Sequence, residues 1–363
     1  MESEKSSPLE KDPLYELIQT YNELNGDIQY LDEEPSPLEF MRFVARNEPF
    51  VIRGAASRWA SHTKWNKEFL KDVFKDQTVN VAVTPFGNAD APTKDDKGEV
   101  IFAKPHEEDQ DFEEFLDHVI SQERSEDTSS EVRYAQTQND NLRNEYLPLF
   151  THVPPSIPFA RIALDRDPDA INLWIGNSRS VTALHKDNYE NIYVQVRGRK
   201  HFVLLPPLCH PCVNEQPLRS ATYHRRGTDD DDDLELKLDE PGAREEKDAN
   251  ADEVGDAPDR VPFATWDPDF PDTNATEYSK LAVPVRLTLE PGDMLYLPAM
   301  WYHKVSQSCP PEAGEGFVLA VNYWYDMDFS GPLYPLSSFV RNVGLQKSAS
   351  KVPRTPERNQ PAK

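Results

Sequence analysis

The stretch Ser180–Pro207 constrains the fold most, because it divides into three short apolar runs separated by turn and breaker signals. The runs end in turn at His185-Lys186-Asp187, at Val196 before Arg197-Gly198, and at Leu205 before Pro206-Pro207. Arg-Gly between two apolar runs is typical of a hairpin turn, and proline stops a strand because it cannot donate to a ladder. The sequence therefore predicts three successive strands, with a histidine and a carboxylate at the end of the first.

The ends of these strands also suggest a metal site. His185 and Asp187 lie two residues apart, and such residues point to the same side of a strand. Two histidines, one carboxylate and open coordination positions are the ligand set of non-haem Fe(II) oxygenases. His303, on a predicted strand Tyr302–Ser306, supplies the second histidine. A lone histidine in a strand-rich domain is more often a hydrogen-bonded core residue, but the set of three favours a metal-binding and catalytic triad of His185, Asp187 and His303.

Composition excludes several classes of function. The chain has 363 residues and 37% hydrophobic content, enough to bury a large core. A formal net charge of −25 argues against nucleic acid and anionic membrane surfaces as partners. No apolar run approaches the roughly 20 residues that span a bilayer. Three cysteines and no apolar N-terminal signal segment indicate a reducing intracellular compartment, the cytoplasm or the nucleus.

Periodicity predicts helices mainly in the first third of the chain and strands after it. The predicted helices are Pro13–Leu24, Leu38–Ala45, Asn66–Phe74, Phe112–Ile120 and Leu333–Val343. The main predicted strands outside the central stretch are Pro49–Gly54, Val79–Val83, Val132–Gln136, Ala170–Ile175, Val283–Leu289, Met294–Leu297, Tyr302–Ser306 and Phe317–Trp324. Many short strands after helices, with 32 prolines against 14 glycines, predict a mainly β fold: a double-stranded β-helix (jelly-roll or cupin) core with helical additions.

We predict one domain over residues 13–345, with a helix-rich part at 13–130 and the jelly-roll core at 131–330. Residues 1–12 and 346–363 are expected to be flexible ends, and residues 86–98 a loop. Asp229–Asp259 contains 15 acidic and 3 basic residues, a local net charge of −12. So polar a segment buries too little apolar surface to offset the entropy of ordering. We therefore predict a disordered acidic insertion over about residues 225–260, within the domain because strand signals resume after it.

Several motifs together resemble one enzyme family, the JmjC hydroxylases. They are Thr-x-x-His-x-Asp from Thr182, Pro-Gly-Asp-Met-Leu-Tyr-Leu-Pro from Pro291, Trp-Tyr-His from Trp301 and Val-Asn-Tyr-Trp-Tyr from Val321. JmjC hydroxylases are Fe(II)- and 2-oxoglutarate-dependent oxygenases of cupin type. The resemblance covers about residues 27–345, except for the acidic insertion, and this ordered set of motifs is far more specific than a single His-x-Asp.

The resemblance implies a role for each matched residue. His185, Asp187 and His303 would bind Fe(II), with 2-oxoglutarate and O2 as cosubstrates. Lys200, at the start of the third strand, would pair with the distal carboxylate of 2-oxoglutarate, although a hairpin lysine is ordinarily solvated. Five further residues would surround the cosubstrate: Thr182, Tyr134, Asn191, Tyr193 and Asn322.

The implied activity is hydroxylation of a protein lysyl side chain at C-3. The implied substrates are GTP-binding proteins of the developmentally regulated class, and a homodimer is also implied. A cationic lysine suits a protein of net charge −25. The alternatives are a JmjC lysine demethylase with the same iron centre, a peptidase, and a catalytically inactive cupin that only binds. The intact ligand set and Lys200 argue against the last.

Cys209-His210-Pro211-Cys212 raises the separate question of a structural zinc site. Such a site needs four ligands, and only Cys309 remains as a further thiol. We therefore expect no zinc there.

Overall fold

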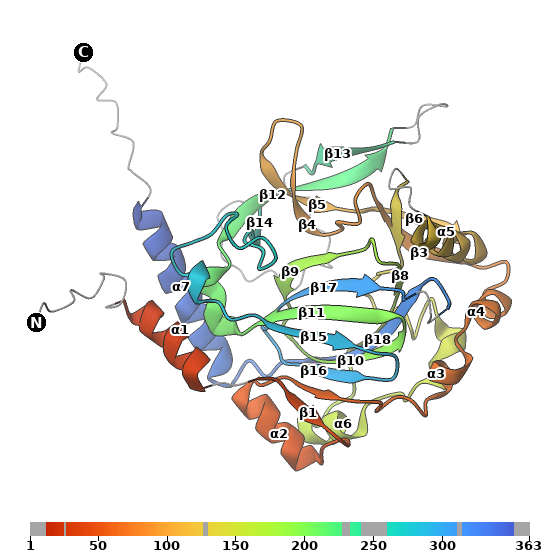
Figure 1. Cartoon of the computed structure of the whole chain (residues 1–363), viewed down its shortest axis with the longest axis horizontal. Helices are drawn as coiled ribbons and strands as arrows, with labels where there is room; N and C mark the ends of the chain where they lie inside the picture. Colours follow the sequence, from red (N-terminus) through yellow and green to blue (C-terminus); the bar gives the residue numbers. More distant parts are fainter. Residues whose placement is uncertain are drawn as a thin grey trace, which may run out of the picture.

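The computed structural model describes residues 12–24, 27–125, 130–226, 233–240, 260–310 and 314–351. Two facing sheets form its centre (Figure 1), a six-stranded sheet in the order β1-β2-β16-β10-β18-β8 and a four-stranded sheet in the order β15-β11-β17-β9. The larger sheet contains β1 (Gln29–Leu31), β2 (Phe50–Ile52), β16 (Met294–Leu297), β10 (Tyr189–Arg197), β18 (Val318–Asp326) and β8 (Ala170–Gly176). The smaller contains β15 (Val285–Leu289), β11 (Arg199–Leu205), β17 (Tyr302–Ser308) and β9 (Thr182–Lys186). These two sheets confirm the predicted jelly-roll core.

The three predicted central strands exist as β9, β10 and β11, and successive strands alternate between the two sheets. The chain turns from β10 into β11 at Gly198, whose φ of +64° is left-handed. A Cβ at Gly198 would lie 2.8 Å from the Val318 side chain, so both conformation and space require glycine. The turn therefore places Lys200, near the start of β11, on the sheet opposite β10.

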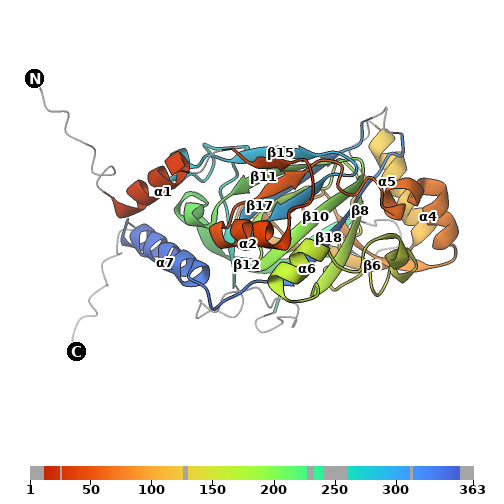
Figure 2. The same cartoon turned by 90° about the horizontal axis from the view of Figure 1, so that it is seen from below.

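Strand β10 is buried on both faces from Glu190 to Val196, as expected for a strand inside the sheet. Ile192 and Val194 point outward into the main hydrophobic core, whereas Tyr193 points inward between the sheets. The outward face is covered by α2 (Pro37–Arg46) and α6 (Pro158–Leu164), as Figure 2 shows. Ser36 and Glu39 form a capping box at the start of α2, which fixes where this covering helix begins.

Two smaller sheets lie beside the core. One has the order β13-β12-β5-β4, with β14 also paired to β12, and the other has the order β6-β3-β7. Their strands are β3 (Thr78–Thr84), β4 (Ala91–Lys94), β5 (Val100–Lys104), β6 (His106–Asp111), β7 (Val132–Tyr134), β12 (Glu215–Arg225), β13 (Leu234–Leu238) and β14 (Arg260–Ala264). We call β4, β5, β12 and β14 the side wall, because they lie beyond the edge strand β9 (Figure 1) and close one side of the cavity described below.

The remaining helices lie at the two ends of the molecule (Figure 2). They are α1 (Pro13–Leu24), α3 (Ala60–Lys64), α4 (Lys67–Val73), α5 (Phe112–Arg124), α7 (Leu333–Lys351) and the 3-10 helices η2 (Leu147–His152), η3 (Pro207–Cys212) and η4 (Ser279–Leu281). No helix in the described ranges is both long and apolar enough to cross a bilayer.

One prediction for the N-terminal third was wrong. Residues 86–98 are not all loop, because β4 pairs with β5 in an antiparallel register from Ala91–Ala103 to Lys94–Val100. The part at 13–130 contains the helices α1 to α5 and also six strands, β1 to β6. Propensity predicted β2 and β3 but missed β1, β4, β5 and β6, because pairing partners determine these four strands more than their own residues do.

The predicted disorder of the acidic insertion is also wrong where the structure describes it. Leu234–Leu238 forms β13, which pairs with β12 from Ala221 to Arg225. Leucine alternates with Glu235 and Lys237 in this strand, and Leu234 and Leu236 are half-buried. Segments 227–232 and 241–259 lie outside the described residues.

The predicted flexible ends need similar correction. Helix α7 continues to Lys351, because residues 345–351 contain no glycine or proline to end it. At the other end, Asp12 is anchored: its carboxylate accepts hydrogen bonds from Leu14 N at 2.9 Å and from Tyr278 Oη at 2.6 Å, and pairs with Lys347. Residues 1–11 and 352–363 are outside the described ranges.

Candidate active site

His185, Asp187 and His303 meet at one point between the two core sheets. His185 on β9 is the direct cross-strand neighbour of His303 on β17. Asp187 Oδ2 lies 3.7 Å from His185 Nε2 and 3.6 Å from His303 Nε2. One ligand atom from each residue lies within 4.8 Å of the other two, and this is the one group of three or more such ligands found among the described residues.

Backbone carbonyls orient both imidazole rings. His185 Nδ1 lies 2.8 Å from Ala183 O, and His303 Nδ1 lies 3.0 Å from Trp301 O. A carbonyl only accepts, so in each ring Nδ1 carries the proton and Nε2 keeps a lone pair. The two lone pairs face Asp187, as metal binding requires.

Burial keeps His303 neutral at physiological pH. Loss of hydration, with the neighbouring His185 ring as a second cause, lowers the pKa of His303 to about 4. A neutral imidazole binds a metal ion, whereas an imidazolium does not. Two neutral imidazoles and one carboxylate on one side of an open cavity fit Fe(II) with positions left for other ligands.

Lys200 lies in the same cavity as the triad and is almost fully buried. Its Nζ donates to Tyr134 Oη at 2.8 Å and lies 5.7 Å from the ring centroid of Tyr193. Burial lowers the pKa of Lys200 to about 7, and no described carboxylate offsets this effect. Because a buried ammonium without a counter-charge is costly, this position suits an anionic ligand in the cavity.

Gly176, at the end of β8, makes room for the Tyr134 ring. A Cβ at Gly176 would lie 2.6 Å from that ring. The glycine therefore allows the tyrosine to reach Lys200.

The other predicted cosubstrate residues line the same cavity. Asn322 on β18 accepts a hydrogen bond from Trp174 Nε1 at 2.8 Å and donates to Asn191 Oδ1 at 3.2 Å. Thr182 is at the start of β9, opposite Val305 on β17. The structure thus brings all nine predicted site residues around one space.

The cavity has a volume of about 720 Å³ and extends from the triad to the side wall. The side wall contributes Ser220, Thr222 and His224, which alternate along β12 and face the cavity. Phe102 on β5 and Phe263 on β14 also line it, with ring centroids 5.0 Å apart. The volume leaves room for a protein side chain beside a small cosubstrate.

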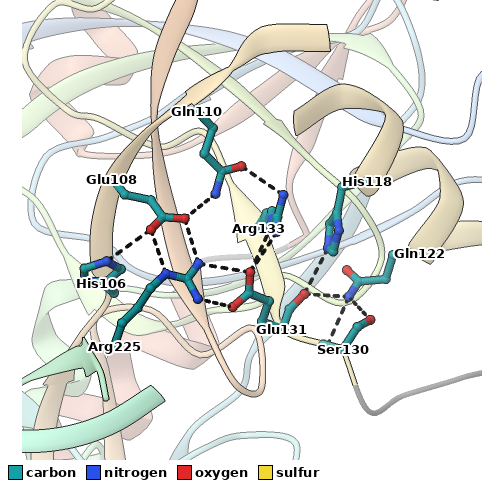
Figure 3. A network of polar contacts seen from close by, with 9 residues as sticks. All are labelled: His106, Glu108, Gln110, His118, Gln122, Ser130, Glu131, Arg133 and Arg225. Atoms are coloured by element: carbon teal, nitrogen blue, oxygen red, sulfur yellow. Dashed lines mark hydrogen bonds and ion pairs between the residues drawn. The ribbon is translucent and has the colours of Figure 1, made fainter. Parts of the chain in front are cut away.

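A polar network attaches the side wall to the neighbouring sheet β6-β3-β7 (Figure 3). Arg225, at the end of β12, donates to Glu108 Oε1 at 2.7 Å and to Glu131 Oε2 at 3.1 Å. Arg133 on β7 donates to Glu131 Oε1 at 2.9 Å. The hydrogen-bonded Arg225 guanidinium lowers the pKa of Glu108 to about 2. The network thereby fixes β12 beside the strand that carries Tyr134.

Cys209 and Cys212 belong to no group of three or more metal-binding side chains in the described part of the chain. Both thiols are free and buried, and His210 between them is paired with Glu215 at 3.2 Å. Glu215 also binds Arg341 of α7 at 2.6 Å. The segment therefore packs against α7.

Sequence reasoning missed the cavity residues of the side wall and Trp174. Trp174 could have been found, because an indole N–H beside a buried asparagine on the next strand suggests a hydrogen bond. The sequence contains no comparable signal for the side wall. Strand β12 pairs with β5 across more than a hundred residues, and local sequence patterns do not predict such long-range pairing.

A double-sheet jelly roll with two histidines and a carboxylate converging between its sheets defines a cupin-type metal protein. The family model described as "Cupin-like domain" matches residues 35–331. The chain belongs to this cupin-like family, in its JmjC-domain branch, which confirms the resemblance seen in its motifs.

Three relatives support this assignment over most of their length. "Lysine-specific demethylase JMJ32" of Arabidopsis thaliana is 37% identical over 91% of this chain and 90% of its own. "JmjC domain-containing protein E" of Dictyostelium discoideum is 33% identical over 82% and 83%. The human "Bifunctional peptidase and (3S)-lysyl hydroxylase JMJD7" is 36% identical over 83% and 85%. The names of these relatives thus include more than one reaction.

Proposed function

We propose that this chain is an Fe(II)- and 2-oxoglutarate-dependent protein hydroxylase that acts on a lysyl side chain at C-3. The observation that carries the proposal is the pairing of two features in one cavity, the His185–Asp187–His303 group and the buried ammonium of Lys200. A metal site alone would suit many reactions. The buried cation beside it selects an anionic cosubstrate that also has a metal-binding end, as a 2-oxo dicarboxylic acid does.

The residues have separate tasks in this proposal. His185, Asp187 and His303 hold the metal, while Lys200 and Tyr134 bind the distal carboxylate of 2-oxoglutarate. Thr182, Asn191, Tyr193 and Asn322 surround the cosubstrate and exclude water. When bound, Fe(II) with 2-oxoglutarate and O2 supplies the oxidant for the C–H bond, and the products are succinate, CO2 and the hydroxylated residue.

The affinity for 2-oxoglutarate is expected to fall as the pH rises above about 7. In the free protein the pKa of Lys200 is about 7, whereas a bound carboxylate stabilises the ammonium and raises this pKa. Binding then takes up a proton above pH 7, so the affinity should fall up to about tenfold per pH unit. Calorimetric titration of the Co(II)-loaded protein between pH 6.5 and 9 measures this slope. A flat profile would contradict the role of Lys200.

A lysine substrate needs a carboxylate in the cavity. Four acidic residues line it in the described part of the chain: Asp90, Glu107, Asp187 and Glu215. Asp187 belongs to the triad and Glu215 is bound by Arg341, while Glu107 is exposed on β6. Asp90 is half-buried, and Gln136 Nε2 orients its carboxylate through a 3.0 Å hydrogen bond. We propose that Asp90 receives the substrate ammonium.

Replacing Asp90 by asparagine should lower kcat/KM for a lysine peptide by about 10- to 100-fold, because hydrogen bonds to charged groups contribute about 1.5–3 kcal/mol. The KM for 2-oxoglutarate should not change. For a norleucine peptide, which lacks the ammonium, kcat/KM should be the same in Asp90→Asn and in the wild-type protein. Glu107→Gln is the matched control and should leave kcat/KM for the lysine peptide unchanged. An equal decrease in kcat/KM for the lysine and norleucine peptides would show that Asp90 does not bind the substrate ammonium.

Hydroxylation, demethylation and peptide cleavage give different products. The test incubates the protein with Fe(II), ascorbate, 2-oxoglutarate and lysine or methyl-lysine peptides from GTP-binding proteins of the developmentally regulated class, our proposed substrates. A gain of one oxygen on lysine, matched by succinate, supports the proposal. Loss of methyl groups would make the chain a demethylase. Cleavage independent of 2-oxoglutarate would make it a peptidase, and no succinate with any peptide would favour a binding module.

A further inference from the structure

The four residues Pro298–Trp301 connect β16 to β17 and contact both segments that carry the triad. Met300 N donates to the backbone carbonyl of Asp187 at 2.7 Å. Trp301 O accepts the hydrogen bond from His303 Nδ1 at 3.0 Å. One short loop therefore fixes the backbone of one ligand and the ring orientation of another.

This loop has an unfavourable backbone conformation at Met300, whose φ is +67°. Residues with a side chain rarely adopt left-handed angles, so surrounding contacts must maintain this one. Met300 is 2% exposed and packs against Ala299 and Met327. Such over-determined strain beside a ligand set is typical of a segment held for function.

Glu190 holds the loop from the β10 side. Its Oε2 accepts hydrogen bonds from Ala299 N at 3.2 Å and from Tyr296 Oη at 2.6 Å. Glu190 is 5% exposed and lies three residues after Asp187 on the outer face of β10. Both ends of the Asp187–Glu190 segment are thus bonded to the loop.

Asn47 also holds the loop. Trp301 Nε1 donates to Asn47 O at 2.9 Å and to Asn47 Oδ1 at 2.8 Å. Asn47 Nδ2 donates to Ala299 O at 3.1 Å. Asn47 is the left-handed C-cap of α2, with φ of 54°, so the helix end and the loop are joined through one side chain.

We propose that Trp301, Glu190 and Asn47 are positioning residues for the metal triad, acting through the loop Pro298–Trp301. The inference rests on the metal site of the proposed function. Partners of metal ligands typically contribute 10- to 100-fold to metal affinity by fixing ligand orientation. Here one buried loop supplies such a partner to His303 and fixes the chain at Asp187, so loosening it should weaken metal binding without removing a ligand.

Trp301→Phe removes the two Nε1 hydrogen bonds and keeps an aromatic ring. Its matched control is Trp65→Phe, because Trp65 is also fully buried and its Nε1 bonds His152 at 2.9 Å, away from the triad. Co(II) binding is followed by its d–d absorption, and the thermal midpoint of the metal-free protein is recorded alongside. We expect the Co(II) dissociation constant of Trp301→Phe to rise about tenfold or more, with an altered d–d spectrum. Trp65→Phe should change the dissociation constant by less than about twofold.

A second pair of variants keeps the test decisive if Trp301→Phe folds poorly. Glu190→Gln retains an oxygen acceptor for Tyr296 and Ala299, whereas Glu190→Ala does not, so only the alanine should lose Co(II) affinity. Unchanged affinity in both Trp301→Phe and Glu190→Ala, or an equal loss in Trp65→Phe, would overturn the inference. Failure of the wild-type protein to bind Co(II) at all would instead overturn the proposed function.

Discussion

The Asp187→Ala variant is expected to lose metal binding and 2-oxoglutarate turnover completely while remaining folded. Asp187 Oδ2 is 3.6–3.7 Å from both imidazole Nε2 atoms and is the one carboxylate of the group. Two neutral imidazoles alone bind a divalent ion weakly and leave its charge uncompensated. The fold should persist, because the hydrogen bond from Met300 N goes to the backbone carbonyl and not to the side chain.

Metal content by mass spectrometry, succinate production and circular dichroism measure the three parts of this expectation. His185→Ala should behave as Asp187→Ala does. His201→Ala is a suitable control, since this histidine of β11 is half-buried and its ring is hydrogen-bonded to Thr288 and Ser308. His201 lies on the face of β11 opposite to that of Lys200. Retained 2-oxoglutarate turnover in both His185→Ala and Asp187→Ala would contradict the assignment of the metal triad.

The Lys200→Met variant should raise the KM for 2-oxoglutarate by about 100-fold or more and leave the Co(II) dissociation constant nearly unchanged. Methionine keeps an unbranched apolar stem beside Tyr134 and Tyr193 but removes the charge that pairs with the distal carboxylate. Removing one partner of a buried charge pair costs about 3–5 kcal/mol, which corresponds to at least a hundredfold. Thermal stability should not fall, because burial already disfavours the ammonium, as the pKa of about 7 shows.

Lys304→Met provides the control for Lys200→Met. Lys304 is also buried and lies on the adjacent strand β17, but its ammonium pairs with Asp267 and Asp269 outside the cavity. It should lower stability without changing either ligand constant. If Lys200→Met weakened Co(II) and 2-oxoglutarate binding equally, the lysine would be a general structural element of the site and not the partner of the carboxylate.

Local signals in the sequence were sufficient for the central strands and for His185 and Asp187. Gly198 and Pro206 mark the ends of β10 and β11 by backbone chemistry, and His185 and Asp187 share a strand end. His303 required more than pattern, because its partner strand lies over a hundred residues away. The resemblance of the surrounding motifs supplied that link, and the cross-strand pairing of His303 with His185 agrees with it.

The side wall could not be predicted, because long-range pairing determines it. β12 pairs with β5 in a parallel register and with β13 and β14 on its other edge. β13 lies inside a segment whose acidic composition suggested disorder, yet its alternating leucines suffice once β12 provides a partner. Average composition over 31 residues concealed a five-residue strand.

The loop Pro298–Trp301 and its role could not be predicted from sequence patterns either. Met300 carries no sequence signal for a left-handed conformation, which is usually indicated by glycine or asparagine. A glutamate in a strand is normally predicted to face solvent, but Glu190 is buried and hydrogen-bonded to Tyr296. Both depend on tertiary contacts between segments more than a hundred residues apart.

Isotope labelling with 18O2 tests the central claim most directly. A hydroxylase that couples substrate oxidation to 2-oxoglutarate should place one atom of the heavy isotope on the lysyl residue and one in succinate, in equal amounts. Both signals should disappear in Asp187→Ala. Labelled succinate without labelled lysine in any peptide would contradict the proposed lysyl hydroxylation, and the absence of both from the metal-loaded wild-type protein would contradict the assignment as an oxygenase.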